Sequence, residues 1–180
     1  MLDLLEGFLT RSPASAEAVA RAPGALPADL EAFYLESDGG EGFVRGEFLR
    51  IYPVTDLAAL NAAFEVAEFA PGLCVFGSNA AGTAFALAKR RVVAVPFIPL
   101  SERFAREVGA ALSDLVRELA ASPAPARKTN PRFAGKEVHH VQPVAFGGDP
   151  LNPMNQIVLP TADYAKLVVW WNRKYRADRG

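Results

Sequence analysis

Three short apolar runs separated by tight turns constrain the fold of this chain more than any other feature. The runs cover residues 73 to 77, 83 to 87 and 91 to 97. A glycine-bearing segment, 78 to 82, joins the first two, and the basic pair Lys89-Arg90 joins the last two. Apolar strands this close in sequence, connected by turns rather than by helices, pair as antiparallel neighbours. Residues 73 to 97 are therefore predicted to form an antiparallel meander.

Helical segments and two more strands surround this meander. Residues 2 to 22 are alanine-rich and helical in pattern with a break at Ser12-Pro13, and a second helix opens at Pro27 and ends at the glycine-rich segment 37 to 42. Two short strands are predicted around the Arg45-Gly46 turn. Amphipathic helices follow at residues 55 to 67, capped by Thr55 or Asp56, and at residues 101 to 120, which carry apolar side chains at spacings of three and four. Helices around a meander favour an α+β fold, with a mostly antiparallel sheet flanked by helices.

Length and composition fit one full domain plus a small appendage. The chain has 180 residues, of which 51% are hydrophobic and 22% charged, enough to bury a sizeable core. No stretch approaches the roughly 18 uninterrupted apolar residues of a membrane span, and Asp3 and Glu6 stand where a signal peptide carries bases. We therefore expect no membrane contact and no export.

The single cysteine points in the same direction. Cys74 lies inside an apolar run, and one cysteine cannot form a disulfide within the chain. A reducing compartment is the natural interpretation, so the sequence predicts a cytoplasmic protein with a buried, inert thiol.

Charge divides the chain into two parts. Residues 1 to 122 carry 16 acidic and 10 basic side chains, a net charge of −6, whereas residues 123 to 180 carry 4 acidic and 9 basic ones, a net charge of +5. The segment between them, 123 to 134, has the proline and small-residue content of a linker. We therefore expect a domain at 1 to 122, a linker at 123 to 134 and a separate C-terminal segment at 135 to 180.

The order of motifs in the first domain resembles a known superfamily. The motifs are Leu26-Pro27-Ala28-Asp29-Leu30 with Phe33, the segment 37 to 42, Leu49-Arg50-Ile51-Tyr52-Pro53, Val75-Phe76-Gly77-Ser78-Asn79, Val95-Pro96-Phe97 and a final helix ending at 115 to 119. In this order and spacing, residues 26 to 119 are similar to the SUKH superfamily. That superfamily includes bacterial immunity proteins for polymorphic toxins, many of which have nuclease domains, and its members bind partners without known catalysis.

The resemblance implies an immunity or antitoxin role. The domain would bind a protein toxin, a nuclease in the favoured case, and cover its active site without chemistry. A nuclease must attract a polyanion, so its surface suits an acidic partner, and the candidate contact residues are Glu36, Asp38, Glu41, Glu65 and Glu68. For each acid taken singly, a solvated surface position is the simpler interpretation.

The C-terminal segment carries a second motif. Both histidines of the chain stand together in residues 135 to 144, and they are followed by Gly147-Gly148, Asn155 and Trp170-Trp171. Over residues 135 to 175 this order resembles the HNH, or ββα-metal, endonuclease motif. The resemblance implies a metal ligand at His139, a general base at His140 and structural roles for Asn155, Gly147, Gly148 and Trp170.

The resemblance fails at one ligand position. A second metal ligand would be expected at 164, which is a tyrosine, and the next helical turn offers only Leu167 and Val168. Asp163 is one residue away, about 100° around a helix. One neutral histidine cannot hold a catalytic cation, because divalent sites need two or three protein ligands. A degenerate unit without cofactor or nuclease activity is therefore favoured.

Two alternatives stay open. One is a metal-dependent HNH endonuclease regulated by the SUKH-like domain, and it requires a divalent metal and a nucleic-acid substrate. The other is a ββα hairpin that packs on the first domain and has no function of its own. The basic residues Arg173, Lys174, Arg176 and Arg179 complement the helix dipole in the favoured interpretation, and form a residual nucleic-acid patch in the other.

Overall fold

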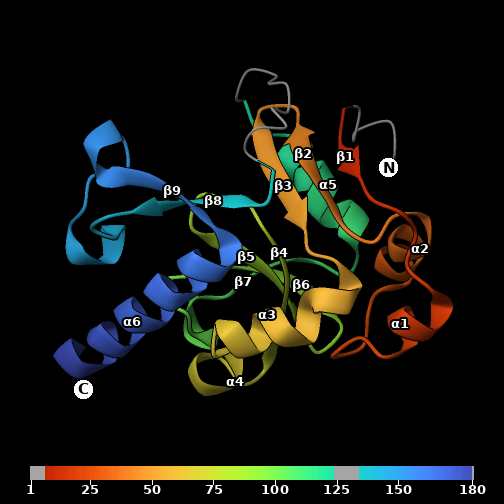
Figure 1. Ribbon diagram of the computed structural model, residues 1–180, viewed down its shortest axis with the longest axis horizontal. Helices are drawn as coiled ribbons and strands as arrows, with labels where there is room; N and C mark the ends of the chain where they lie inside the picture. Colours follow the sequence, from red (N-terminus) through yellow and green to blue (C-terminus); the bar gives the residue numbers. More distant parts are fainter. Residues whose placement is uncertain (1–6, 124–133, 180) are drawn as a thin grey trace.

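The computed structural model describes residues 7 to 123 and 134 to 179 and confirms an α+β fold. Seven strands form one sheet, in which each strand pairs antiparallel with the next along the chain (Figure 1). These strands are β1 (Leu9–Thr10), β2 (Gly40–Val44), β3 (Glu47–Ile51), β4 (Leu73–Ser78), β5 (Thr83–Ala88), β6 (Arg91–Pro96) and β7 (Arg106–Gly109). The predicted meander corresponds to β4, β5 and β6, and the predicted strands around Arg45-Gly46 to β2 and β3.

Helices lie on both sides of this sheet, and a small ββα unit ends the chain. The α-helices are α1 (Ala16–Ala20), α2 (Ala28–Glu36), α3 (Leu57–Ala63), α4 (Val66–Phe69), α5 (Leu112–Ala120) and α6 (Thr161–Arg179), and the 3-10 turns are η2 (Val54–Asp56), η3 (Glu102–Phe104), η5 (Val144–Phe146) and η6 (Pro153–Asn155). A two-stranded antiparallel sheet, β8 (Lys136–His140) with β9 (Gln156–Pro160), precedes α6. Residues 2 to 6 of the predicted first helix, and residues 124 to 133 of the predicted linker, lie outside the described residues.

The large sheet is curled around α5. This helix contacts both β2 and β7, which are five places apart in the strand order. In a flat sheet those strands would lie roughly 24 Å apart, since neighbouring strands are about 4.8 Å apart. One helix about 10 Å wide reaches both only because the sheet bends round it. On the other side, α3 and α4 pack on β4, and in Figure 1 they lie in front of the central strands.

The predicted helix over residues 101 to 120 is wrong in its first half. Residues 102 to 104 form η3, and β7 pairs with β6, with Glu107 opposite Val93. The helix α5 begins only at Leu112, where the Asp114 carboxylate accepts hydrogen bonds from the N–H groups of Ala110 and Ala111, at 2.9 and 3.1 Å. The edge of β6 thus pairs with a segment whose apolar spacing would also suit a helix, because tertiary pairing overrides local propensity.

Two other predicted helices are shorter than expected. Residues 55 to 67 form η2, α3 and α4 with a break at Glu65, whose φ is +51°. Neither Thr55 nor Asp56 caps α3 through its side chain. Among residues 7 to 22 only 16 to 20 are helical, and Leu9–Thr10 forms β1 at the edge of the sheet.

The ββα unit shares its core with the large sheet. Tyr164 of α6 packs its ring against Phe97, which follows β6, and Phe64, which follows α3, with ring centroids 5.3 and 6.2 Å away. Ala165, Val168 and Val169 belong to the same buried cluster as the strands of the sheet. The two parts expected to be separate units are therefore in direct contact through a continuous apolar core.

Cys74 is half-buried rather than fully buried. Burial raises the pKa of its thiol to about 11, and its Sγ lies 2.8 Å from the carbonyl oxygen of Pro23. A thiol with this pKa is protonated at neutral pH and is therefore a weak nucleophile. No helix among the described residues is both long and apolar enough to cross a membrane.

Candidate functional site

The two histidines lie on β8 and face opposite sides of the small sheet. Side chains alternate along a strand, so Glu137 and His139 point toward the core while Val138 and His140 point the other way. Burial follows this alternation, since residues 137 and 139 are buried and residues 138 and 140 are half-exposed. The strand is also fixed to the large sheet, because the N–H of Val138 donates to the carbonyl of Ala80 at 2.8 Å.

His139 is packed against the residue that stands at the expected second ligand position. Its side chain faces the ring of Tyr164, with ring centroids 5.6 Å apart, and the residue is only 4% exposed. Burial, with a smaller contribution from His140, lowers the pKa of His139 to about 4. The imidazole is therefore neutral at pH 7, the form in which a histidine can bind a metal.

The chemistry at position 164 does not complete a metal site. Tyr164 is fully buried, and burial raises the pKa of its phenol, so the hydroxyl stays protonated and is a poor ligand. Asp163 is exposed and pairs with Lys166 at 2.8 Å. Within residues 7 to 123 and 134 to 179, no group of three or more histidine, cysteine, aspartate or glutamate side chains could hold an ion. The geometry of a ββα unit is present, but the ligand set is not.

A small pocket of about 150 Å³ adjoins the histidine pair. Its lining includes both histidines, Tyr164, Val144 and Phe97, and residues 81 to 83 of the turn between β4 and β5. A cavity of this size can hold several waters or one small polar group. His140 is the half-exposed titratable group at its rim.

The loop between β8 and β9 is organised by Asn155. Its side-chain oxygen accepts from the N–H of Gln142 at 2.7 Å, and its amide donates to the carbonyl oxygens of Gln142 and Asp149, both at 3.0 Å. The motif gives this asparagine a structural role, and its side chain holds the loop through hydrogen bonds to the backbone atoms of Gln142 and Asp149. It makes no hydrogen bond to His140 among those of the described chain.

Glycine is required at the two motif positions, 147 and 148, for different structural reasons. Gly147 ends η5 with a φ of +84°, a left-handed conformation that glycine adopts at no steric cost. At Gly148, a Cβ atom would stand 1.8 Å from the carbonyl oxygen of Gln142, so no side chain fits. Trp170, which the motif gives a structural role, is 54% exposed and contacts the ring of Trp171 with ring centroids 4.7 Å apart, and Trp171 packs on Phe146 with ring centroids 4.6 Å apart.

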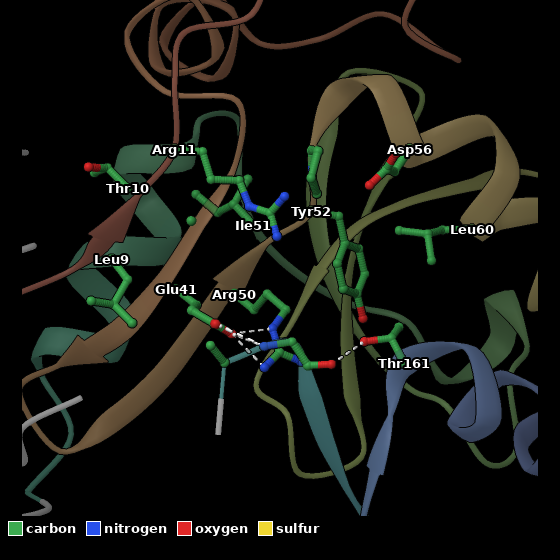
Figure 2. A pocket seen from close by; sticks show the side chains of 14 residues that line it. Leu9, Thr10, Arg11, Glu41, Arg50, Ile51, Tyr52, Asp56, Leu60 and Thr161 are labelled. Carbon is green, nitrogen blue, oxygen red and sulfur yellow. Dashed lines mark hydrogen bonds and ion pairs between the residues drawn. The ribbon is translucent and has the colours of Figure 1, made fainter. Parts of the chain in front are cut away.

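A buried ion-pair network joins the ββα unit to the large sheet. Glu137, with 0% of its surface exposed, accepts a hydrogen bond from the guanidinium of Arg50 on β3. It also accepts from the hydroxyls of Tyr52 and Ser78, each at 3.1 Å. Arg50 further contacts Glu41 at 2.6 Å (Figure 2) and donates to the carbonyl of Lys136 at 2.8 Å. Five side chains, from β2, β3, β4, β8 and the residue that follows β3, thus form hydrogen bonds with one another in the core.

Electrostatics within this network follow from burial and pairing together. Burial disfavours the Arg50 cation, but the carboxylates of Glu137 and Glu41 outweigh it and raise the pKa of the guanidinium. Burial raises the pKa of the Glu137 carboxyl, and Arg50, Ser78 and Tyr52 oppose that rise. This network was not predicted from the sequence. Its signal was Arg50, a charge within the apolar strand 48 to 51, since a buried charge requires a partner.

A pocket of about 370 Å³ lies above this network. Figure 2 shows Tyr52 and Ile51 facing the space, with the Arg11 and Asp56 side chains at opposite edges and Thr161 below, where its hydroxyl donates to the carbonyl of Gly135 at 3.2 Å. Arg11 and Asp56 are exposed and make no side-chain hydrogen bond or ion pair within the described chain. The pocket is therefore polar at its rim and apolar at its back wall.

Four of the five acids predicted to contact a partner have partners inside the chain. Asp38 accepts from the N–H of Val54 at 2.6 Å, and Glu41 is buried in the ion pair with Arg50. Glu65 pairs with Arg173 at 2.7 Å, and Glu68 lies 3.4 Å from Arg176, both on α6. Glu36 alone is exposed with no recorded partner in the described chain. These acids therefore do not form one free surface.

Comparisons with known proteins identify a similar fold but no family. No family model matches the sequence, and no curated protein matches it. The crystal structure of Atu4351 from Agrobacterium tumefaciens is similar, with a TM-score of 0.58 at 13% identity, over 94% of this chain and 88% of that one. Residues 1 to 122 are only about two thirds of the 180, so the likeness extends into the ββα unit. The chain therefore has a fold similar to that of a solved structure over 94% of its length.

Proposed function

We propose that this chain is a non-catalytic binding protein of the immunity type, which neutralises a bacterial toxin, a nuclease in the favoured case, by covering its active site. The class of partner comes from the resemblance of residues 26 to 119 to the SUKH superfamily. The observation that supports a binding role is the apolar surface of the ββα unit. A cytoplasmic location goes with this role, because a toxin delivered into a cell acts there, and no cofactor is needed.

Exposed large apolar side chains gather on one part of the chain. Of nine such residues among those described, only Leu35 and Phe104 precede the ββα unit. The other seven are Val141, Val144, Leu151, Met154, Ile157, Val158 and Trp170. Exposed apolar side chains that are concentrated on one unit favour a protein contact there, whereas scattered single ones are normal on any protein surface.

Two residues of this group are almost fully in solvent. Leu151 is 86% exposed and Met154 is 87% exposed, both in the loop organised by Asn155. Fully burying such a side chain against a partner stabilises a complex by about 1.5 to 3 kcal/mol. Methionine is also flexible and adapts to irregular partner surfaces. These two side chains are therefore the expected centre of the contact.

The chemistry of the histidine pair supports binding without turnover. His139 faces a protonated, buried phenol rather than a second ligand. A general base at His140 would have no metal beside it to stabilise the leaving oxygen. Attraction of a basic partner would rest on the surplus of acidic side chains over residues 1 to 122, which is partly offset by the cations of the C-terminal segment that packs against them.

The test is binding and rescue with a nuclease toxin domain encoded beside the gene for this chain. The full chain is expected to bind the domain at 1:1 in isothermal titration and to restore growth of bacteria that express it. Leu151→Asp with Met154→Asp should weaken binding at least about tenfold per residue. Leu35→Asp, at a site 47% exposed on α2, is the matched control and should leave binding unchanged.

A cleavage assay on the same preparation separates this role from a nuclease. Plasmid and RNA are incubated with the chain and Mg²⁺, Mn²⁺, Zn²⁺ or Ni²⁺. We expect no metal-dependent cleavage. Cleavage that is lost in His140→Ala would overturn the proposal and make the chain an HNH endonuclease.

A further inference from the structure

A groove of about 320 Å³ lies where the last turns of α6 meet the loop that follows β6. It is separate from the histidine pocket and from the exposed loop 141 to 158. Two aromatic residues, Phe69 and Tyr175, and three arginines, Arg103, Arg176 and Arg179, line it. The lining residues include no acidic side chain. This concentration of cations contrasts with the chain's net charge of −1.

The walls of this groove are fixed by a buried amide. Asn172 of α6 accepts from the N–H of Leu100 at 2.6 Å and donates to the carbonyl oxygens of Phe97 and Val168 at 2.8 and 2.9 Å. All of its hydrogen bonds are therefore made within the fold. The helix and the loop cannot separate without leaving a buried amide unpaired.

Each of the three guanidinium groups is held over an aromatic ring. Arg103 lies 4.4 Å from the ring centre of Phe104, Arg176 lies 4.6 Å from that of Phe69, and Arg179 lies 4.9 Å from that of Tyr175. Arginines stacked in this way lose less side-chain entropy when they bind an anion. The groove is thus pre-organised for a ligand with several oxygens.

Most side-chain donors of these three arginines have no hydrogen-bond partner among residues 7 to 123 and 134 to 179. Arg103 donates to the hydroxyl of Tyr175 at 3.2 Å. Arg176 donates to the carbonyl of Glu68 at 2.8 Å and lies 3.4 Å from its carboxylate. The side chain of Arg179 makes no hydrogen bond within the described chain.

Few acids nearby reduce this positive charge. Glu102 precedes Arg103 and keeps its charge, but it is not among the lining residues, and its carboxylate accepts from the N–H of Gly72. Glu65 and Asp178 are engaged with Arg173 and Lys174, so those pairs are locally neutral. Only Glu68 offsets one of the three cations directly.

We propose that this groove binds the phosphate group of a nucleotide-sized ligand. Arginine forks match phosphate oxygens in geometry and charge, and several free forks converge on one concave surface. A volume near 320 Å³ is at the lower end for small-molecule sites and suits one nucleotide. The phosphate belongs either to a free nucleotide or to one residue of a single strand, where planar guanidinium groups stack on bases.

The experiment titrates inorganic phosphate, AMP and a ten-residue thymidine strand into the full chain at low salt. Binding of AMP or the strand is expected, and Arg103→Gln with Arg179→Gln should weaken it at least about tenfold, because charge-assisted pairs are lost. Arg21→Gln removes a cation outside the groove, on the residue that follows α1 and with 76% of its side chain exposed, and should change nothing. Since the Arg179 side chain makes no hydrogen bond among the described residues, Arg179→Gln alone is the variant to use if the double variant unfolds.

The probes distinguish the sources of the phosphate. Affinity for AMP equal to that for the strand assigns a free nucleotide, whereas strand affinity that falls steeply with salt assigns nucleic acid. The proposal is overturned if no probe binds at millimolar concentration, or if binding is undiminished in folded Arg103→Gln, Arg179→Gln protein. Neither result depends on toxin binding, because the variants tested for that role lie on another surface.

Discussion

Replacing Glu137 by alanine should be among the most destabilising single changes in the protein. The substitution removes the carboxylate that accepts from Arg50, Tyr52 and Ser78 in a site closed to water. Arg50 keeps Glu41, but two hydroxyls and one guanidinium nitrogen lose their acceptor. Breaking one side of a buried ion pair lowers the free energy of unfolding by about 3 to 5 kcal/mol. In a chain of this length, that lowers the unfolding midpoint by about 10 °C.

Urea unfolding followed by circular dichroism and by tryptophan fluorescence measures this loss. Glu137→Gln keeps an acceptor for the hydroxyls but loses the charge, so we expect a smaller loss of about 1 to 3 kcal/mol. Glu118→Ala breaks the exposed pair with Arg106 and serves as the control, with little change in midpoint. A loss below about 1 kcal/mol for Glu137→Ala would refute the view that this network fixes the ββα unit to the sheet.

Four further outcomes follow from the structure. Fluorescence of Trp170 and Trp171, the only tryptophans, should change at the same urea concentration as circular dichroism, because α6 shares the main core; two separate transitions would mean independent units. For His139, burial lowers the folded pKa to about 4 from an ordinary value of 6.5, so its contribution to the free energy of unfolding is complete above pH 6.5 and is lost as pH falls toward 4. His139→Phe should therefore make the urea midpoint less dependent on pH between 4 and 6.5. An unchanged pH profile would show that His139 is not the source of this dependence. Gly148→Ala should lower the free energy of unfolding by at least about 2 kcal/mol, because its Cβ would overlap the Gln142 carbonyl. Limited proteolysis of the loop checks this, and equal cleavage rates for variant and parent would contradict it. Asp29→Ala should lower stability by about 1 kcal/mol in urea unfolding, since its carboxylate accepts from the first N–H groups of α5, at 3.0 and 2.8 Å; no change would show that water replaces it.

Local patterns predicted the parts of the fold in which neighbours in sequence pair. The meander and the strands around Arg45-Gly46 follow from short apolar runs and turn residues, and these were correct. The failure at residues 101 to 120 arose because Val108 and the apolar residues of α5 fit one helical spacing, although β6 pairs with part of the segment. Which segment completes a sheet edge depends on the rest of the fold, and one sequence window does not contain that information.

The candidate site shows the same division. The pairing of β8 with β9, and the contact of position 164 with His139, are close to what the ββα motif predicts. The Arg50–Glu137 pair spans 87 residues, and no local pattern connects its members. The acids were a poor guide to a partner surface because composition gives the number of charges but not their internal partners, such as Arg173 for Glu65.

The long sequence separation between Arg50 and Glu137 also affects how the protein folds as it is synthesised. Strand β3 emerges from the ribosome early, with a charged side chain that has only Glu41 to neutralise it in the core. At about 5 to 20 residues per second, several seconds pass before the second carboxylate is made. We expect the sheet to stay loosely packed and exposed to aggregation until then. Premature termination before residue 137 should therefore yield chains that chaperones or proteases remove, rather than a stable smaller domain.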